Sequence, residues 1–356
     1  TLGLSVCGVD LILDAKTKRI YFLEINTAPE WEAFQKTTGV KPAEMIIKLS
    51  KSLSKREKRP TPELIENYYC DNRDFLGLED LHLISRLYLW TKRPKWIAMS
   101  KKIEKKYLGR TQQERKKILE SLIESAKIKK LTKNPKRNIY LEECPRLLVF
   151  HNLMFRGLLA ETVFKKNIRP SLSEYLNEAE LNEYCSLLAR DKEAVAFLST
   201  FAVNFFCLSE WYLKKSCRPS IDFFIGAGKV LDEKNISEVI LKIYLFTHLI
   251  IGFSLFYARK ISQPKKEISK IFIELEILLK TYYAKLPLDV KLEFLVVSKL
   301  AGRETGLRDK IIDEAEKNLS PVGNFISNEK IGERLFALNS FRTSEHRNIL
   351  YLMANN

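Results

Sequence analysis

Three residues near the start of the chain, Asp10, Glu24 and Asn26, have the types and spacing of a site for a hard divalent cation. Glu24 and Asn26 are two positions apart in the apolar run 21–26, so a β-strand would place both on one face of its sheet. Asp10 lies in an earlier apolar run, which a hairpin would bring alongside. Two carboxylates and an amide oxygen would then converge, and oxygen ligands of this kind suit Mg²⁺.

The elements that must position these residues are short. Residues 4–14 and 19–25 alternate in hydropathy around the charged turn 15–18, which predicts an antiparallel hairpin. A loop over residues 26–39 follows. Proline at the first turn then opens a helix over residues 42–53.

Four sequence features around these residues occur in a fixed order. Residues 8–10 read Gly-Val-Asp in an apolar strand, and residues 24–26 read Glu-Ile-Asn. Pro29 follows the asparagine by three positions, and residues 36–39 read Lys-Thr-Thr-Gly before a helix. Together they resemble the C-terminal end of ATP-grasp ligases, most closely the RimK type, whose members add glutamate to carboxyl ends.

This resemblance implies a ligase that uses ATP with Mg²⁺ or Mn²⁺. In that family a carboxylate attacks the γ-phosphate of ATP, and an amine opens the resulting acylphosphate, so the substrates are a carboxylate and an amine: an amino acid, a peptide or a protein tail. Asp10 and Glu24 would hold paired metal ions, with Glu24 bridging both and Asn26 binding one. By the same resemblance, Thr37, Thr38 and Gly39 correspond to a loop of the family that lies near the acceptor or the phosphates.

The chain departs from the family pattern at two positions. The family usually has glycine where Glu30 stands and tends to have glycine where Ala33 stands. Both departures concern the substrate loop rather than the metal ligands.

We expect this chain to be the C-terminal part of a longer protein, because it begins at Thr1 inside the ATP-grasp pattern. The ATP-binding lysines and the glycine-rich loop over the phosphates would then lie upstream. On this interpretation the chain from Thr1 to Asn356 does not catalyse the reaction alone.

Composition favours a reduced, cytoplasmic protein with ordinary globular cores. The six cysteines are scattered without Cys-x-x-Cys spacing, which indicates neither a disulfide framework nor a zinc site. The formal net charge is +16, and residues 101–140 carry 14 basic and 4 acidic residues. The positive charge is therefore concentrated in one block.

That basic block has two interpretations. Three helices, over residues 78–89, 96–108 and 111–126, precede a predicted hairpin around the turn 133–136, and this order is typical of a winged helix. A winged helix would bind nucleic acid through residues 101–137, with salt-dependent phosphate contacts. Alternatively, the block is a solvated face of a helical domain, or a surface for an acidic protein partner.

The remaining sequence has helical periodicity almost throughout. Two long uncharged runs, 194–209 and 243–257, are shorter than the ~20 residues that a bilayer span needs. Their polar insertions Asn204, Thr247 and His248 favour buried core helices, so no membrane association is expected. The predicted helices are 146–165, 172–190 (with a Ser171–Glu174 capping box), 191–214, 236–260, 264–285, 288–301, 306–318, 328–339 and 343–353.

The fold class that we predict is therefore mainly α, with a small antiparallel hairpin at the N-terminus and a large helical region. The predicted domains are an ATP-grasp fragment (1–53), a basic linker (54–62), a basic helical or winged-helix-like module (63–145) and an all-helical domain (146–356). Two functions stay open. One is an ATP-dependent carboxylate–amine ligase whose helical extension binds a substrate or partner. The other is a helical, nucleic-acid-associated binding protein that carries a non-catalytic ATP-grasp remnant.

Overall fold

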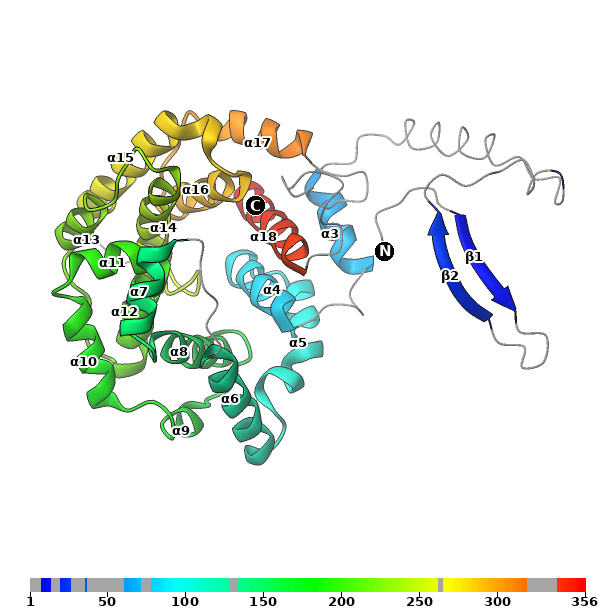
Figure 1. Ribbon diagram of the computed structural model, residues 1–356, viewed down its shortest axis with the longest axis horizontal. Helices are drawn as coiled ribbons and strands as arrows, with labels where there is room; N and C mark the ends of the chain where they lie inside the picture. The colour runs from blue at the N-terminus through cyan, green and yellow to red at the C-terminus, as the bar shows by residue number, and fades with distance from the viewer. Residues whose placement is uncertain are drawn as a thin grey trace.

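Helices make up most of the protein, which confirms the prediction of a mainly α fold (Figure 1). The computed structural model describes residues 8–13, 20–26, 36, 61–71, 78–127, 134–261, 265–318 and 338–356. Two strands, β1 (Gly8–Leu13) and β2 (Ile20–Asn26), precede the first helix described. The helices predicted over 42–53 and, up to its last two residues, over 328–339 lie outside the described residues.

Among the described helices, six form an inner ring (Figure 1). Each packs against the next in the order α8, α12, α14, α16, α18 and α4, and α5 and α6 lie between α4 and α8. The bounds of the six are α4 Leu78–Thr91, α8 Leu147–Thr162, α12 Thr200–Leu213, α14 Ile236–Phe253, α16 Leu288–Leu300 and α18 Leu338–Asn355.

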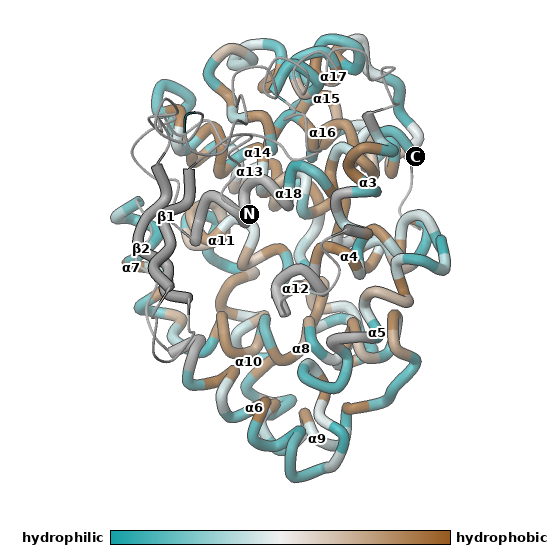
Figure 2. Tube along the Cα trace, turned by 90° about the vertical axis from the view of Figure 1, so that its right-hand side faces the viewer, coloured by the Kyte–Doolittle hydropathy of each residue, from teal (hydrophilic) through white to brown (hydrophobic). Residues whose placement is uncertain are grey.

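The other helices surround this ring, with hydrophilic residues gathered at helix ends and connecting turns (Figure 2). Chain order partly alternates between ring and periphery, because each of the ring helices α12, α14 and α16 is followed by an outer helix. The outer helices are α3 Thr61–Asp71, α5 Pro94–Leu108, α6 Gln112–Lys127, α7 Pro135–Glu143, α9 Arg169–Leu172, α10 Glu178–Leu188, α11 Lys192–Leu198, α13 Ile221–Gly228, α15 Lys265–Tyr282 with a 3₁₀ turn Tyr283–Lys285, and α17 Arg308–Lys317.

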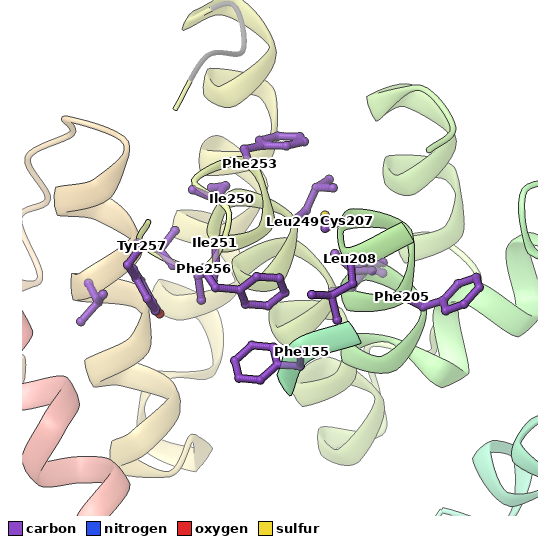
Figure 3. Packing of buried hydrophobic residues seen from close by; sticks show 14 of the residues in the cluster. Phe155, Phe205, Cys207, Leu208, Leu249, Ile250, Ile251, Phe253, Phe256 and Tyr257 are labelled. Carbon is purple, nitrogen blue, oxygen red and sulfur yellow. The ribbon is translucent and has the colours of Figure 1, made fainter. Parts of the chain in front are cut away.

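One hydrophobic core joins the described helices from Ile65 to Ala354. Figure 3 shows a part of it where α12 meets α14, with Cys207 beside Leu249. The backbones approach closely here, because a Cβ on Gly252 would collide with the Cys207 sulfur. The aromatic rings of Phe155 and Phe256 meet edge to face, with centroids 5.2 Å apart. This packing fixes the relative positions of α8, α12 and α14.

The predicted winged-helix hairpin is wrong, because residues 135–143 form the helix α7. The Asn134–Pro135 pair that suggested a hairpin turn instead starts this helix. The Asn134 side chain accepts a hydrogen bond from the Arg137 backbone N–H at 3.1 Å. Proline is well suited to the first helical turn, since its missing N–H has no partner there. Asn134 and Pro135 are compatible with a hairpin turn and with a helix start, and the packing of α7 against α11 favours the helix.

The long helix predicted over 191–214 is two helices, α11 and α12, which meet at Ser199 with a bend of 103°. Ser199 is fully buried, has a φ of 50° and donates a hydrogen bond to the Leu241 carbonyl at 2.7 Å. That bond to α14 holds a conformation that a non-glycine residue rarely adopts. No glycine or proline marks the break, so periodicity alone merges the two helices.

Two further helix boundaries differ from the prediction. The Ser171–Glu174 capping box is wrong, because α10 starts at Glu178 and is capped by Asn177, which accepts from the Ala179 and Glu180 amides. By contrast, Thr111 caps α6 as predicted, accepting from the Glu114 amide at 3.1 Å. The helix predicted over 236–260 ends at Phe253, followed by three residues with positive φ, Leu255, Phe256 and Tyr257.

One described helix, α14, is long and apolar enough to cross a membrane, and 67% of that stretch is buried inside the protein. Its ring neighbours α12 and α16 cover its apolar faces. A core helix of a soluble protein can have the same length and composition.

Candidate functional site

The N-terminal residues singled out by the sequence lie on β1 and β2. The strands pair antiparallel, and by Cα register Asp10 stands opposite Glu24 while Gly8 stands opposite Asn26. The register shifts between Asp10 and Leu11, so that Leu11 stands opposite Phe22 and the pairing continues from there. The structure thus places Asp10, Glu24 and Asn26 within two residue steps of one ladder. Thr37, Thr38 and Gly39 lie outside the described residues.

A second group of polar side chains lies on the helices of the ring. We define the central polar cluster as Arg86, Arg137, His151, Asn204, Thr247, His248, Glu293 and His346. Apart from Arg137, which comes from α7, these residues come from α4, α8, α12, α14, α16 and α18, so that every ring helix contributes at least one.

Hydrogen bonds with one consistent direction run through this cluster. His248 Nδ1 lies 2.9 Å from the Asn204 carbonyl oxygen, which can only accept, so Nδ1 carries the proton. The Asn204 amide nitrogen donates to His151 Nε2 at 3.4 Å, and His151 Nδ1 then donates to the Asn152 carbonyl oxygen at 3.2 Å. This relay makes His151 Nε2 an acceptor, so that imidazole is neutral, and it places a proton on His248 Nδ1.

His248 Nε2 faces the carboxyl group of Glu293, whose Oε1 is 3.8 Å away. Glu293 is only 4% exposed and also accepts a hydrogen bond from the Thr247 hydroxyl. Burial raises the pKa of Glu293 to about 7, against a smaller lowering by the Thr247 hydrogen bond and by Arg86. Burial, followed by the charges of Arg86, His346, His151 and Arg137, holds the pKa of His248 well below its usual value.

The two remaining histidines of the cluster are also held neutral. Burial lowers the pKa of His151 to about 4, with Arg86 adding to this effect and the Asn152 hydrogen bond opposing it. Burial and then Arg86 lower the pKa of His346 to about 4. Chemically, the cluster therefore combines neutral imidazoles with one buried carboxyl group whose pKa lies near neutral pH.

A carboxylate–arginine group borders the cluster. Asp289 on α16 accepts hydrogen bonds from the Tyr244 hydroxyl at 3.1 Å and from Arg347 at 3.3 Å, joining α14, α16 and α18. Arg137 donates to the Leu198 carbonyl at 3.3 Å and lies over the Phe201 ring at 4.5 Å. Burial lowers the pKa of Arg137 to about 10, so this guanidinium stays charged at neutral pH.

Three buried polar atoms of the cluster have no hydrogen-bond partner among the described residues: Arg86 Nε, Arg137 Nε and His346 Nε2. Buried donors of this kind are rare in native proteins and call for a specific explanation. No group of three His, Cys, Asp or Glu side chains within the described part of the chain could hold a metal ion. The cluster is therefore not built as a cation site.

A basic groove of about 1030 Å³ is lined by residues of α4 and α15, of the segment after α14 and of the C-terminal end of α16. Trp90 and Tyr257 form an aromatic corner of it, with ring centroids 5.8 Å apart. Its charged lining residues are Lys92, Arg259, Lys260, Lys299 and Arg303. None of the residues that line the groove in the described chain is acidic, so it presents a positive potential.

The basic block 101–137 lies mainly on α5, α6 and the start of α7. Six lysines of this block are exposed: Lys101, Lys105, Lys106, Lys116, Lys117 and Lys136. They form part of the solvated surface of helices, and the wing that the sequence predicted for nucleic-acid binding is absent at residues 135–143.

The comparison with family models found one match, in the N-terminal segment. Residues 1–49 match the RimK-like ATP-grasp domain. This match confirms the resemblance that the four sequence features indicate, and it extends over the RimK-like segment alone. Neither a search of curated proteins nor a search of solved structures returned a match for the chain.

Sequence reasoning found only some of the cluster. His248, Thr247 and Asn204 stand out in the sequence as polar residues inside apolar runs, and the structure joins His248 to Asn204 by a hydrogen bond between two ring helices. Arg86 and Glu293 were missed. Each is a charged residue on the inner face of a ring helix, and it can be recognised in the sequence only when that face is known.

Proposed function

We propose that this chain is the C-terminal part of a Mg²⁺-dependent ATP-grasp ligase that joins a carboxylate to an amine through an acylphosphate. The match of residues 1–49 to the RimK-like ATP-grasp domain carries this proposal. On this proposal the protein is cytoplasmic, and its substrates are an amino acid, peptide or protein tail.

Asp10, Glu24 and Asn26 would hold the metal ions. Their donor atoms are carboxylate and amide oxygens, which suit Mg²⁺ or Mn²⁺. The register supports this role, because Asp10 and Glu24 stand directly opposite each other in the ladder. Like charges at directly paired positions are destabilising, and a bound cation would remove that repulsion. Bound Mg²⁺ would neutralise phosphate charge and orient the nucleotide.

The helical ring would bind a substrate or partner of this ligase. The ring is large and has a buried polar cluster and a basic groove, neither of which lies in the residues that match the ATP-grasp domain. Phosphoryl transfer needs positioning and charge neutralisation, which the metal ligands provide. We therefore assign to the ring the binding of the substrate or partner on which the ligase acts.

Isothermal titration of the full-length protein with ATP in the presence of Mg²⁺ tests the proposal. Glu24→Gln removes one ligand charge while it keeps the size of the side chain, and we expect it to weaken Mg²⁺–ATP binding at least about tenfold. Glu32→Gln is the matched control, because it neutralises a carboxylate of the same segment outside the motif. Equal affinity of the wild type and Glu24→Gln would contradict the assignment of the metal ligands.

A further inference from the structure

We propose that the basic groove binds single-stranded nucleic acid, with its cations holding phosphates and its aromatic corner stacking against a base. The groove lies in the helical ring, so this assignment does not rest on the ligase function of the RimK-like segment. It is also separate from the basic block, because none of the groove-lining residues in the described chain falls within residues 101–137.

Cations reach the groove from three different parts of the ring. Lys92 follows α4, Arg259 and Lys260 follow α14, and Lys299 and Arg303 lie at the end of α16. All five residues are exposed. Positive charges that are spread over three segments suit a ligand with several separated negative charges, and a strand of phosphodiesters has this chemistry.

These five cations form no ion pair with any described residue. A lysine near a helix C-terminus is stabilised by the carbonyl groups there, and this effect accounts for a single cation but not for so many in one groove. Burial, followed by the charge of Lys165, lowers the pKa of Lys92. Burial, followed by the charge of Arg308, lowers the pKa of Lys299. A bound polyanion would relieve this repulsion between cations.

The aromatic corner adds a surface that a simple anion would not need. Trp90 of α4 and Tyr257 of the turn after α14 both line the groove and meet edge to face, with centroids 5.8 Å apart. Trp90 is partly exposed, so that its indole is accessible from the groove. Grooves that bind single strands combine cations for the backbone with aromatic side chains for the bases. The same combination is present here.

The turn that follows α14 has an unusual backbone that brings several of these side chains together. Residues 255–257 have φ values of 51°, 54° and 71°, a conformation that residues other than glycine rarely adopt. The Ser254 hydroxyl accepts a hydrogen bond from the Tyr257 N–H at 2.9 Å, and Phe256 packs edge to face on Phe155 (Figure 3). Strained backbone of this kind is concentrated at functional sites.

The size of the groove favours a strand over a single nucleotide. Its volume of about 1030 Å³ lies at the upper end of the roughly 300–1,000 Å³ of small-molecule sites. The affinity of a strand grows with every phosphate that contacts a cation, whereas one nucleotide can use only some of the cations. We therefore expect ATP to bind the groove much more weakly than an oligonucleotide does.

Fluorescence anisotropy of labelled oligo-dT and oligo-rU tests the proposal on the full-length protein. A length of about 12 nucleotides lies within the site sizes of known single-strand binders. We expect saturable binding that weakens as salt is added, with a slope of log K against log salt of about −0.7 for each phosphate contact. The buffer contains EDTA and no ATP, so the outcome is separate from that of the metal-site experiment.

Charge variants assign the binding to the groove. Arg259→Gln and Lys299→Gln should each weaken binding at least about threefold and make the salt slope shallower by about 0.7, since each removes one phosphate contact. Neither side chain has an ion pair in the described chain to lose. Lys117→Gln is the matched control, because Lys117 is an exposed lysine of the basic block outside the groove, and it should bind like the wild type.

Stacking is tested separately from charge. Trp90→Leu should weaken binding at least about fivefold and leave the salt slope unchanged, because it removes the stacking surface and no phosphate contact. Trp90→Phe keeps an aromatic ring and should recover most of the affinity, which guards against a variant that fails to fold. An abasic strand of the same length makes the same test on the wild-type protein, where it should bind more weakly than oligo-dT.

Three results would overturn the proposal. One is the absence of saturable binding of either oligonucleotide to the wild-type protein at low salt. Another is tighter binding of an oligo-glutamate peptide of equal charge, which would assign the groove to an acidic protein segment. The third is equal weakening by Lys117→Gln and by the groove variants, which would show that the strand is held by the general positive charge of the surface.

Discussion

The RimK-like segment and the helical ring carry their polar residues in opposite ways. In the segment, Asp10, Glu24 and Asn26 lie within one short stretch and one strand pair. In the ring, the residues of the central polar cluster come from every ring helix, and Arg86 and His346 are separated by most of the chain. A local motif can be recognised from spacing, whereas a site assembled by tertiary packing cannot.

The largest effect that we predict concerns Asn204, which joins two histidines in the ring. Asn204→Leu removes the partner of both His248 Nδ1 and His151 Nε2 while it keeps a side chain of similar size. Two buried polar atoms are then unsatisfied, and we expect a loss of about 3 kcal/mol in the free energy of unfolding. Urea denaturation measures it.

Asn182→Leu is the matched control for that experiment, because its side-chain hydrogen bond to the Glu178 carbonyl lies at the surface. We expect this control to change the free energy of unfolding by less than about 0.5 kcal/mol. If the two variants lose the same amount, the cluster is not a cooperative network and the contrast between segment and ring is weaker than described.

A smaller effect concerns the pH dependence of stability. His151 and His346 have native pKa values of about 4, below their ordinary 6.5, so the unfolded state binds more protons between pH 4 and 6.5. Stability should therefore rise with pH across this window. Glu293, with a native pKa of about 7 instead of 4.5, acts in the opposite direction, because the folded state keeps the proton longer.

Two variants separate these contributions in urea unfolding measured between pH 4.5 and 6.5. His346→Gln should reduce the rise of stability with pH by up to one proton, and Glu293→Gln should steepen it. If the pH dependence of the free energy of unfolding is unchanged in both variants, then His346 and Glu293 do not have shifted pKa values in the native protein.

The general fold was predictable because its signals are local. The periodicity of α6 and the cap at Thr111 are visible in the sequence and agree with the structure. The errors occurred where one local signal has two outcomes. Asn134–Pro135 starts a helix as readily as it makes a turn, and the choice depends on the packing of α7 against α11.

The break at Ser199 was not predictable, since its unusual backbone conformation is held by a hydrogen bond to Leu241 of another helix. The central polar cluster was only partly predictable for the same reason. The sequence distinguishes Thr247 and His248 inside an apolar run. Glu293, in contrast, acquires its significance only when α16 is placed beside α14, so that its carboxyl group meets Thr247 and His248.

Amide hydrogen exchange of the full-length protein, with and without Mg²⁺–ATP, tests most directly whether the RimK-like segment holds the nucleotide. We expect Mg²⁺–ATP to slow exchange in residues 8–26 and to leave the ring helices α12, α14 and α16 unchanged, with the effect lost in Glu24→Gln. Slower exchange confined to the ring helices, or no change in residues 8–26, would contradict the account.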